Sequence, residues 1–219
     1  ENNYQIVQFD SEVLREYDIR GIVDKNINEN TAYTIGRIFG YVVYDRLNSN
    51  NISLGYDGRL TSPKLYKALS AGLRDSGAKV YSIGICPTPM LYFADFYLKT
   101  DAAIMITGSH NPPEYNGFKM VINKHSFFSE NIQKFQSLVN KIGLETKVGS
   151  VQEVDIIEAY VERVLKNISI NKKLKISWDI GNGAMGVIIN KLVSKLKNTE
   201  NILLNQNVDG NFPNHHPDP

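Results

Sequence analysis

The chain has 219 residues, 42% of them apolar and 21% charged, a balance that excludes intrinsically disordered, collagen-like and low-complexity proteins. Its 24 basic and 23 acidic residues give a formal net charge of +1, so no basic field attracts nucleic acid or an anionic membrane. No apolar stretch reaches the roughly 18 residues of a membrane span, and the N-terminal residues lack the pattern of a signal peptide. The single cysteine, Cys86, cannot form an intrachain disulfide and is predicted to be buried. We therefore expect a cytoplasmic globular protein with neither nucleic-acid nor membrane partners.

The first part of the chain alternates between helical and strand periodicity. The spacing of apolar residues predicts helices over 31–47, from Ser62 to Gly77 and from Ser129 to Gly143. The second of these helices opens on Ser62-Pro63, where serine can cap free N–H groups and proline loses no needed donor. Short apolar runs bounded by turn residues predict strands over 51–57, 79–85 and 101–107. This alternation predicts a three-layer α/β/α domain with a mixed, mostly parallel sheet over residues 1–150.

The second part of the chain repeats the alternation after a short break. Residues 144–152 are polar and lack helical periodicity, which predicts a linker. Beyond them the pattern predicts a helix, a strand, a helix and a strand, over 154–166, 174–180, 185–197 and 202–206. We interpret residues 151–219 as an incomplete second domain of the same type, because one strand–helix–strand piece cannot cover both faces of its own sheet. The open edge of this sheet would allow association with another chain.

The segment TGSHNPPEYNGFK, residues 107–119, is the most informative for function because it directly follows a predicted strand. Ligands of open α/β sheets bind beyond the carboxyl ends of the strands. Gly108 would let the backbone turn sharply and expose Ser109, and the prolines that follow forbid helix. His110 and Lys119 place hydrogen-bond donors beside this hydroxyl, which suits an oxygen that carries a phosphoryl group.

Two other interpretations of this segment stay open at the level of spacing. An ordinary solvated turn is the simpler one, because Gly, Ser, Asn and Pro are common turn residues. A serine hydrolase that uses Ser109 and a histidine would react with fluorophosphonate probes. Against it, the sequence has no G-x-S-x-G elbow, since position 111 is Asn. A P-loop motif, G-x-x-x-x-G-K-[ST], is absent as well.

Six segments, in order along the chain, resemble signatures of the α-D-phosphohexomutases, the phosphomannomutase/phosphoglucomutase family. Residues 107–119 resemble the phosphoserine loop of that family. The other segments are REYDIRG (15–21), GYDGRLTSP (55–63), GICPTP (84–89), DIGNGAMG (179–186) and VDGNFPNHHPDP (208–219). By this resemblance the chain is identified as a member of the family, over the first domain and about half of the second.

Members of that family are four-domain enzymes that move phosphate between the 1- and 6-positions of a hexose, through a phosphoserine and a bisphosphorylated sugar. The resemblance implies that Ser109 is the phosphoryl carrier and, once phosphorylated, a ligand of Mg²⁺ through its phosphate. It implies that Arg20 reaches into the catalytic cleft, that Lys119 stabilises the transferred phosphate, and that Tyr17 lines the same wall. His110 is expected to support Ser109 by hydrogen bonding. The substrate would be a phosphorylated hexose, with a hexose 1,6-bisphosphate as activator; mannose, glucose and glucosamine remain alternatives.

Several of these residues also have simpler structural interpretations. Arg20 could be a surface arginine paired with Asp18, and Lys119 a solvated lysine. Tyr17 could be a core aromatic, and Trp178 is predicted to be a core residue of the second-domain strand.

The remaining motif residues are given supporting roles. We expect Asp57 and Arg59 to organise the loop that carries the serine, and residues 87–89 to form a rigid turn. His215 and His216 are not expected to bind a metal, because adjacent side chains point apart in an extended chain and the family uses aspartates.

The chain departs from the family pattern in one large respect. It contains no D-G-D-x-D-R loop, which carries the family's metal-binding aspartates, and none of its later sugar- and phosphate-binding loops. Loss of one major electrostatic stabiliser costs roughly a few kcal/mol. We therefore expect the 219 residues alone to have negligible mutase activity. The alternative is a non-catalytic remnant, or an α/β module that binds a phosphosugar or a partner.

Overall fold

A computed structural model describes residues 3–143 and 145–218, and its main feature is one seven-stranded sheet. Its strands are β1 (Ile19–Ile22), β2 (Asn51–Tyr56), β3 (Lys79–Ile85), β4 (Ala102–Ile106), β5 (Tyr115–Ile122), β6 (His125–Ser126) and β7 (Ser150–Glu153). Their order is β1-β5-β4-β2-β3-β7, with β6 paired to β5. Strands β4, β2, β3 and β7 are parallel neighbours, whereas β5 is antiparallel to β1, β4 and β6. The predicted mixed, mostly parallel sheet is therefore confirmed, and β5 runs against the other strands described.

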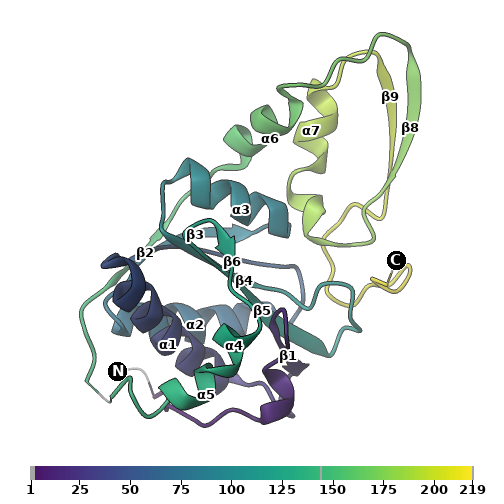
Figure 1. Cartoon of the computed structure of the whole chain (residues 1–219). Helices are drawn as coiled ribbons and strands as arrows, with labels where there is room; N and C mark the ends of the chain where they lie inside the picture. The colour runs from purple at the N-terminus through teal and green to yellow at the C-terminus, as the bar shows by residue number, and fades with distance from the viewer. Residues whose placement is uncertain (1–2, 144, 219) are drawn as a thin grey trace.

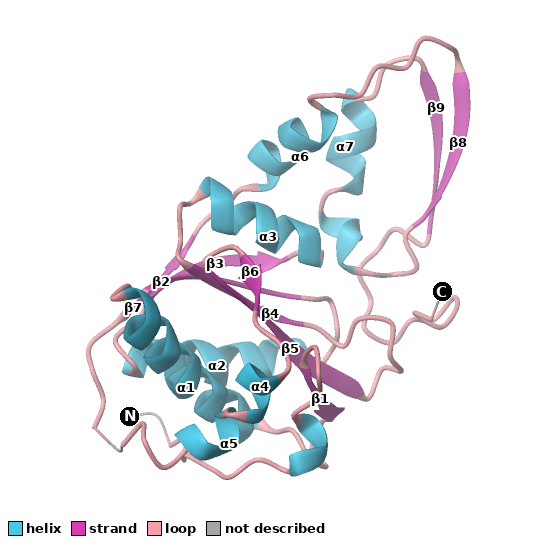
Figure 2. Cartoon of the chain, viewed as in Figure 1, coloured by secondary structure: helices cyan, strands magenta, loops and turns pink. Residues whose placement is uncertain are grey.

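Helices cover both faces of this sheet (Figures 1 and 2). Helices α1 (Glu29–Leu47), α2 (Ser62–Asp75), α4 (Glu130–Gln133) and α5 (Phe135–Leu138) lie on one face, and α3 (Thr88–Tyr97) lies on the other. Residues of β4 alternate between the two layers: Ile104 and Ile106 belong to the core beneath α1 and α2, whereas Ala103 and Met105 belong to the core beneath α3. Such a strand is buried on both faces, which confirms the three-layer α/β/α prediction.

The second part of the chain packs against α3. Helices α6 (Ile157–Leu165) and α7 (Ile189–Lys195) join the same apolar core, which contains Val161 and Leu192 together with Met90 and Leu91 of α3. Strands β8 (Leu174–Asp179) and β9 (Thr199–Leu204) form a parallel two-stranded sheet, linked through the 3-10 turn η2 (Ala184–Val187) and α7. In Figure 1 this small sheet lies at the far end of the molecule from α1 and α2. Trp178 is half-buried against the core, so the prediction for it is confirmed in part.

Three predictions of local structure are wrong. In the expected linker, Leu144 lies outside the described residues, but Ser150–Glu153 form β7, whose backbone pairs with the edge of β3 although its side chains are exposed. The helix expected from Ser129 to Gly143 is divided into the short helices α4 and α5. The expected turn at residues 87–89 is the start of α3, because proline in a first helical turn gives up no needed hydrogen bond.

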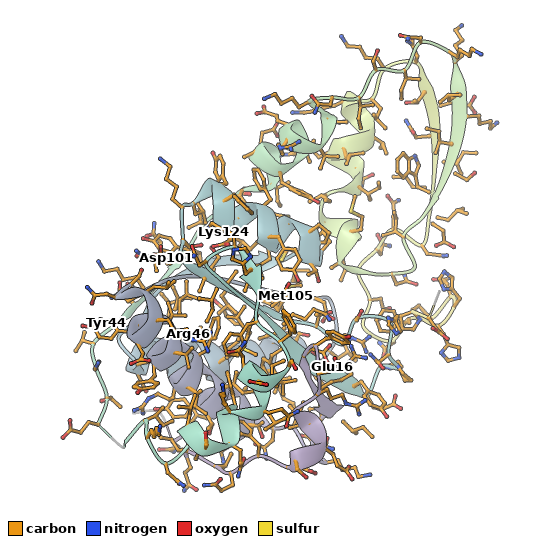
Figure 3. The ribbon with its side chains drawn as sticks, in the orientation of Figure 1. Glu16, Tyr44, Arg46, Asp101, Met105 and Lys124 are labelled. Atoms are coloured by element: carbon orange, nitrogen blue, oxygen red, sulfur yellow. The ribbon has the colours of Figure 1, made fainter. Side chains whose placement is uncertain are left out.

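At the start of β4, the end opposite the loop that carries Ser109, a hydrogen bond and an ion pair hold the neighbouring segments together. Asp101 and Lys124 lie there close together (Figure 3), and the backbone N–H of Asn123 donates to the carbonyl oxygen of Asp101 over 2.8 Å. Lys124 forms an ion pair with the buried Asp95, with 2.8 Å between Nζ and Oδ1. Among the described helices, none is long and apolar enough to cross a lipid bilayer.

Candidate functional site

The carboxyl ends of β2, β3, β4 and β8 open onto one cleft with a volume of about 380 Å³. This is where an open α/β sheet places its ligands. From the first part of the chain the cleft is lined by Asp57, Arg59, Thr88, Met105 and Ser109. From the second part it is lined by Asp179, Asn182, Phe212 and His215. The two parts therefore contribute to one site.

Ser109 is exposed in this cleft, at the start of the loop between β4 and β5, residues 107–114, which we call the serine loop. Its backbone has a φ of 54°, a left-handed conformation that costs a non-glycine residue free energy. The backbone N–H of Ser109 donates to Oγ1 of Thr107 over 2.8 Å, and that of Asn111 to the carbonyl oxygen of Gly108 over 3.0 Å. The turn therefore presents the serine hydroxyl outward in a strained conformation that its neighbours hold.

Gly108 has a different role from the predicted one. The left-handed residue of the turn is Ser109, and Gly108 is not among the glycines of positive φ. A Cβ atom on Gly108 would lie 2.3 Å from Nε of Arg59. Glycine is therefore needed there because the arginine side chain passes directly against the backbone.

Arg59 holds the serine loop by its backbone carbonyl groups. Nη2 donates to the carbonyl oxygens of Ser109 over 2.8 Å and Asn111 over 2.7 Å. Nη1 donates to the carbonyl oxygens of Pro112 over 2.6 Å and Tyr115 over 3.2 Å. The side chain is only 1% exposed. Burial lowers the pKa of Arg59, and the neighbouring Asp57 opposes this shift.

Asp57 connects the same loop to the start of α2. Its Oδ2 accepts from the N–H of Gly108 over 3.0 Å and from Nε of Arg59 over 3.2 Å. Its Oδ1 accepts from the hydroxyl of Ser62 over 2.6 Å. Ser62 therefore does not cap the helix as predicted; the N-cap residue of α2 is Thr61. The prediction that Asp57 and Arg59 organise the serine loop is confirmed.

Arg20 and Lys119 meet on a shared carboxylate. Arg20 comes from β1 and Lys119 from β5, which are antiparallel neighbours. Both reach Oδ2 of Asp18, whose side chain is 7% exposed, with 2.6 Å to Nη2 of Arg20 and 3.1 Å to Nζ of Lys119. The charge of Arg20 contributes to lowering the pKa of Arg59, so the two guanidinium groups lie within electrostatic reach of each other. The pairing of Arg20 with Asp18, predicted as an alternative, is thus present and includes Lys119.

The other two residues predicted at the site are at the surface. Tyr17 is 69% exposed, so it is not a core aromatic. His110 is exposed, and its Nδ1 lies 3.4 Å from Oγ of Ser109, a long contact. Residues 115–119, expected to continue the loop, form the first half of β5; this explains how Lys119 comes to lie beside β1.

The opposite wall of the cleft contains an ion pair that the sequence did not indicate. Nε2 of His215 lies 3.1 Å from Oδ2 of Asp179, and Nδ1 lies 2.8 Å from the carbonyl oxygen of His216. Hydrogen bonds to the His216 backbone and to Asp179 raise the pKa of His215. Hydrogen bonds from Asn205, from the backbone of Gly181 and from His215 lower the pKa of Asp179. Both side chains are about half exposed, so the pair is partly screened by water.

Cys86 also lines the cleft, but its thiol is unreactive. Its side chain is fully buried, as predicted, and burial raises the pKa of the thiol to about 12. A thiol of this pKa is not a nucleophile at neutral pH.

The described residues do not form a magnesium site on their own. Mg²⁺ is held by several oxygen ligands in octahedral geometry. In residues 3–143 and 145–218, no three His, Cys, Asp or Glu side chains are grouped to hold a metal ion. Asp57, which lines the cleft, already accepts hydrogen bonds from Gly108, Arg59 and Ser62.

The chain matches two models of one protein family and several named relatives. Residues 11–145 match the family model described as phosphoglucomutase/phosphomannomutase, alpha/beta/alpha domain I, and residues 158–219 match the model for domain II. The phosphomannomutase/phosphoglucomutase of Pseudomonas syringae pv. tomato is 44% identical over 207 residues, which are 94% of this chain and 44% of that protein. The phosphoglucomutase of Neisseria gonorrhoeae is 42% identical over 210 residues, 95% of this chain and 45% of that protein.

A solved structure has the same fold. The crystal structure of a phosphoglucomutase/phosphomannomutase family protein from Burkholderia thailandensis superimposes with a TM-score of 0.87 at 37% identity. The match covers 95% of this chain and 47% of that one. The chain therefore spans about half the length of the relatives it matches.

Proposed function

Because the chain belongs to the phosphoglucomutase/phosphomannomutase family, we propose that Ser109 carries a phosphoryl group between the 1- and 6-positions of a hexose phosphate. The observation that supports this most is the exposed, left-handed Ser109 at a cleft, in a loop whose carbonyl groups are held by the buried Arg59. Phosphoryl transfer depends on positioning and charge stabilisation more than on covalent chemistry by the protein. A rigid, outward-facing hydroxyl meets the first of these needs.

The transfer requires two half-reactions that balance. In the first, the bond from phosphorus to Oγ of Ser109 breaks and a bond from phosphorus to a hydroxyl oxygen of the hexose monophosphate forms, while the proton of that hydroxyl is released and Oγ gains one. In the second, the other phosphate of the sugar bisphosphate moves to Oγ, which loses its proton, and the released sugar oxygen takes one up. The phosphorylated serine is restored, and the sugar phosphate has changed position.

The cations near the serine loop have supporting roles in this proposal. Arg20 and Lys119 share Asp18, which keeps both long side chains in one place on adjacent strands. An arginine fork and an ammonium group both bind phosphate oxygens. Tyr17, exposed next to Asp18, would contact the sugar, and His110 would support the serine hydroxyl.

The proposal also includes a cofactor and a location, although the described residues do not form a magnesium site on their own. A phosphorylated Ser109 would offer its phosphate oxygens to Mg²⁺, and a hexose 1,6-bisphosphate would load the serine. A phosphorylated hexose as substrate goes with a cytoplasmic location.

The direct test is phosphorylation of Ser109. Incubating the chain with glucose 1,6-bisphosphate and measuring its intact mass should reveal the addition of one phosphoryl group, which the Ser109→Ala variant should lack. Ser129→Ala is a matched control, because Ser129 has the same φ of 54° but does not line the cleft. No addition to the wild-type chain would contradict the proposal and favour a module that only binds a phosphosugar or a partner.

We further propose that residues 1–219 by themselves turn over hexose phosphates negligibly, because sustained turnover needs both half-reactions in succession, whereas the loading of Ser109 needs only one. The described residues group no metal ligands, and the sequence has no D-G-D-x-D-R loop. A coupled mutase assay with bisphosphate activator and Mg²⁺ tests this, and ordinary turnover by the 219-residue polypeptide would contradict it.

A further inference from the structure

Residues 205–212, which we call the bridging segment, connect the second part of the chain to the loop that carries Arg59. On one side, the N–H of Asp209 donates to the carbonyl oxygen of Asn182 over 3.0 Å. On the other side, Val208 packs so closely that a Cβ atom on Gly58 would lie 2.2 Å from its Cγ1. A Cβ atom on Gly210 would lie 2.5 Å from the backbone nitrogen of Leu60. The segment therefore contacts the backbone on both sides of Arg59.

Phe212 ends the bridging segment with its ring against the Arg59 guanidinium. Its own φ is 48°, and its N–H donates to the carbonyl oxygen of Asp209 over 3.1 Å. The ring centroid lies 5.4 Å from Cζ of Arg59, within the range of a cation–π contact. The in-plane N–H groups of Arg59 bind Asp57 and the carbonyl groups of the serine loop. When the N–H groups in the plane of a guanidinium are hydrogen-bonded in this way, its two faces can still stack against an aromatic ring.

We propose that Phe212 is a positioning residue for Ser109, acting through Arg59; this inference rests on the proposed function. The ring shields one face of the guanidinium from water, and hydrogen bonds in a water-poor setting are stronger. Without the ring, water competes for the N–H groups that hold the carbonyl oxygens of Ser109 and Asn111. The serine hydroxyl then samples more positions, and transfer slows because it depends on alignment.

This arrangement links the serine loop to the second part of the chain. The bridging segment is attached to Asn182, which lies in the turn after β8. Its other end contacts the guanidinium that holds the turn after β4. The position of Ser109 thus depends on residues about a hundred positions later in the chain. The sequence of the serine loop by itself does not reveal this dependence.

The experiment compares hydrogen exchange of residues 107–116 with the rate of Ser109 phosphorylation by saturating glucose 1,6-bisphosphate. Phe212→Leu should speed exchange in that segment and slow phosphorylation, each by about twofold to tenfold, the effect of one cation–π contact. Phe212→Tyr keeps an aromatic face and should match the wild type in both. Phe96→Leu is the control, because Phe96 makes a similar contact with Lys124, at 5.1 Å, but does not line the cleft.

Each outcome has a distinct meaning. If Phe212→Leu matches the wild type in exchange and in phosphorylation, or if Phe212→Tyr behaves like Phe212→Leu, the positioning role is overturned. If Phe212→Leu unfolds, as exchange in α1 would reveal, Phe212→Met decides the comparison, because its unbranched side chain occupies the space without an aromatic face. A wild-type chain that takes up no phosphoryl group overturns the proposed function and the positioning role with it. That result is distinguishable from failure of the inference alone, where the wild-type chain is phosphorylated.

Discussion

Nη2 of Arg59 lies 2.8 Å from the backbone carbonyl oxygen of Ser109, although 50 residues separate the two along the chain. The same guanidinium binds three further carbonyl groups, of Asn111, Pro112 and Tyr115. One buried side chain, brought in from the end of β2, therefore sets the shape of the turn that follows β4. A reactive group held by buried, hydrogen-bonded neighbours is preorganised for its task.

Replacing Arg59 by lysine tests this arrangement. An ammonium group cannot supply the planar set of donors that the loop carbonyl groups use. We expect Arg59→Lys to lower the free energy of unfolding by at least about 1.5–3 kcal/mol, the value of one hydrogen bond to a charged group. Urea unfolding measures this change. The control Arg163→Lys lies on the exposed face of α6 and should change stability by less than about 0.5 kcal/mol. Equal stability of the two variants would contradict the role of Arg59.

Comparing Gly108→Ala with Gly84→Ala separates the effect of a lack of space from the effect of backbone strain. The added Cβ atom would lie 2.3 Å from Nε of Arg59, so the guanidinium or the loop must move. We expect a loss of about 1–3 kcal/mol, as for overpacking, together with faster hydrogen exchange in residues 107–116. In the matched variant Gly84→Ala, the glycine has a φ of +72° but nothing lies within 4 Å of the added atom. Gly84→Ala should cost about 1–2 kcal/mol through strain and leave exchange in the serine loop unchanged. Unchanged exchange in Gly108→Ala would show that the loop absorbs the extra atom.

The pair of His215 and Asp179 should respond to pH in a defined window. The pKa of His215 is raised above 6.5, so its contribution to stability is fully present below pH 6.5 and is lost as pH rises through the higher folded value. The pKa of Asp179 is lowered below 3.8, so its contribution is present above pH 3.8 and is lost as pH falls through the lower folded value. The pair is therefore complete between these two folded values.

A titration of the His215 imidazole protons by NMR measures this. The midpoint should lie above pH 6.5 in the wild type and move down in Asp179→Asn, although not fully, because the His216 carbonyl group still accepts from the ring. Added salt should reduce the difference between the two proteins, since the pair is half exposed. The same midpoint in both would show that Asp179 does not affect His215.

Replacing Asp18 by asparagine tests the cluster on β1 and β5. The change removes the negative charge that Arg20 and Lys119 share and leaves two cations facing each other. We expect a loss of about 1.5–3 kcal/mol in the free energy of unfolding, because the Asp18 side chain is only 7% exposed. Asp24→Asn is the matched control: it breaks an ion pair with Lys64 whose carboxylate is 67% exposed, and should cost about 0–1 kcal/mol. Similar losses in both variants would mean that the shared carboxylate adds nothing to stability.

The sequence alone predicts the elements whose pattern is local. Strands β2, β3 and β4 coincide closely with apolar runs between turn residues, and α1 and α2 with helical spacing of apolar residues. These elements are buried against one another, so hydrophobic burial imposes a periodicity that the sequence displays. The serine loop, the exposure of Ser109 and the support of Asp57 and Arg59 follow from the motifs within and beside these elements.

What only the tertiary structure decided depends on contacts between distant segments. β7 exists because its backbone pairs with the open edge of β3, a stabilisation that its exposed and mostly polar side chains do not indicate. Gly108 is required by the passage of Arg59. Phe212 meets Arg59 only because the second part of the chain packs on α3 and returns over the cleft. His215 meets Asp179, 36 residues earlier, because the chain after β9 turns back to the end of β8. Backbone pairing and close contacts between segments far apart in the chain produce no periodic pattern in the sequence. Every residue has a backbone carbonyl group, and the fold determines which donor reaches it.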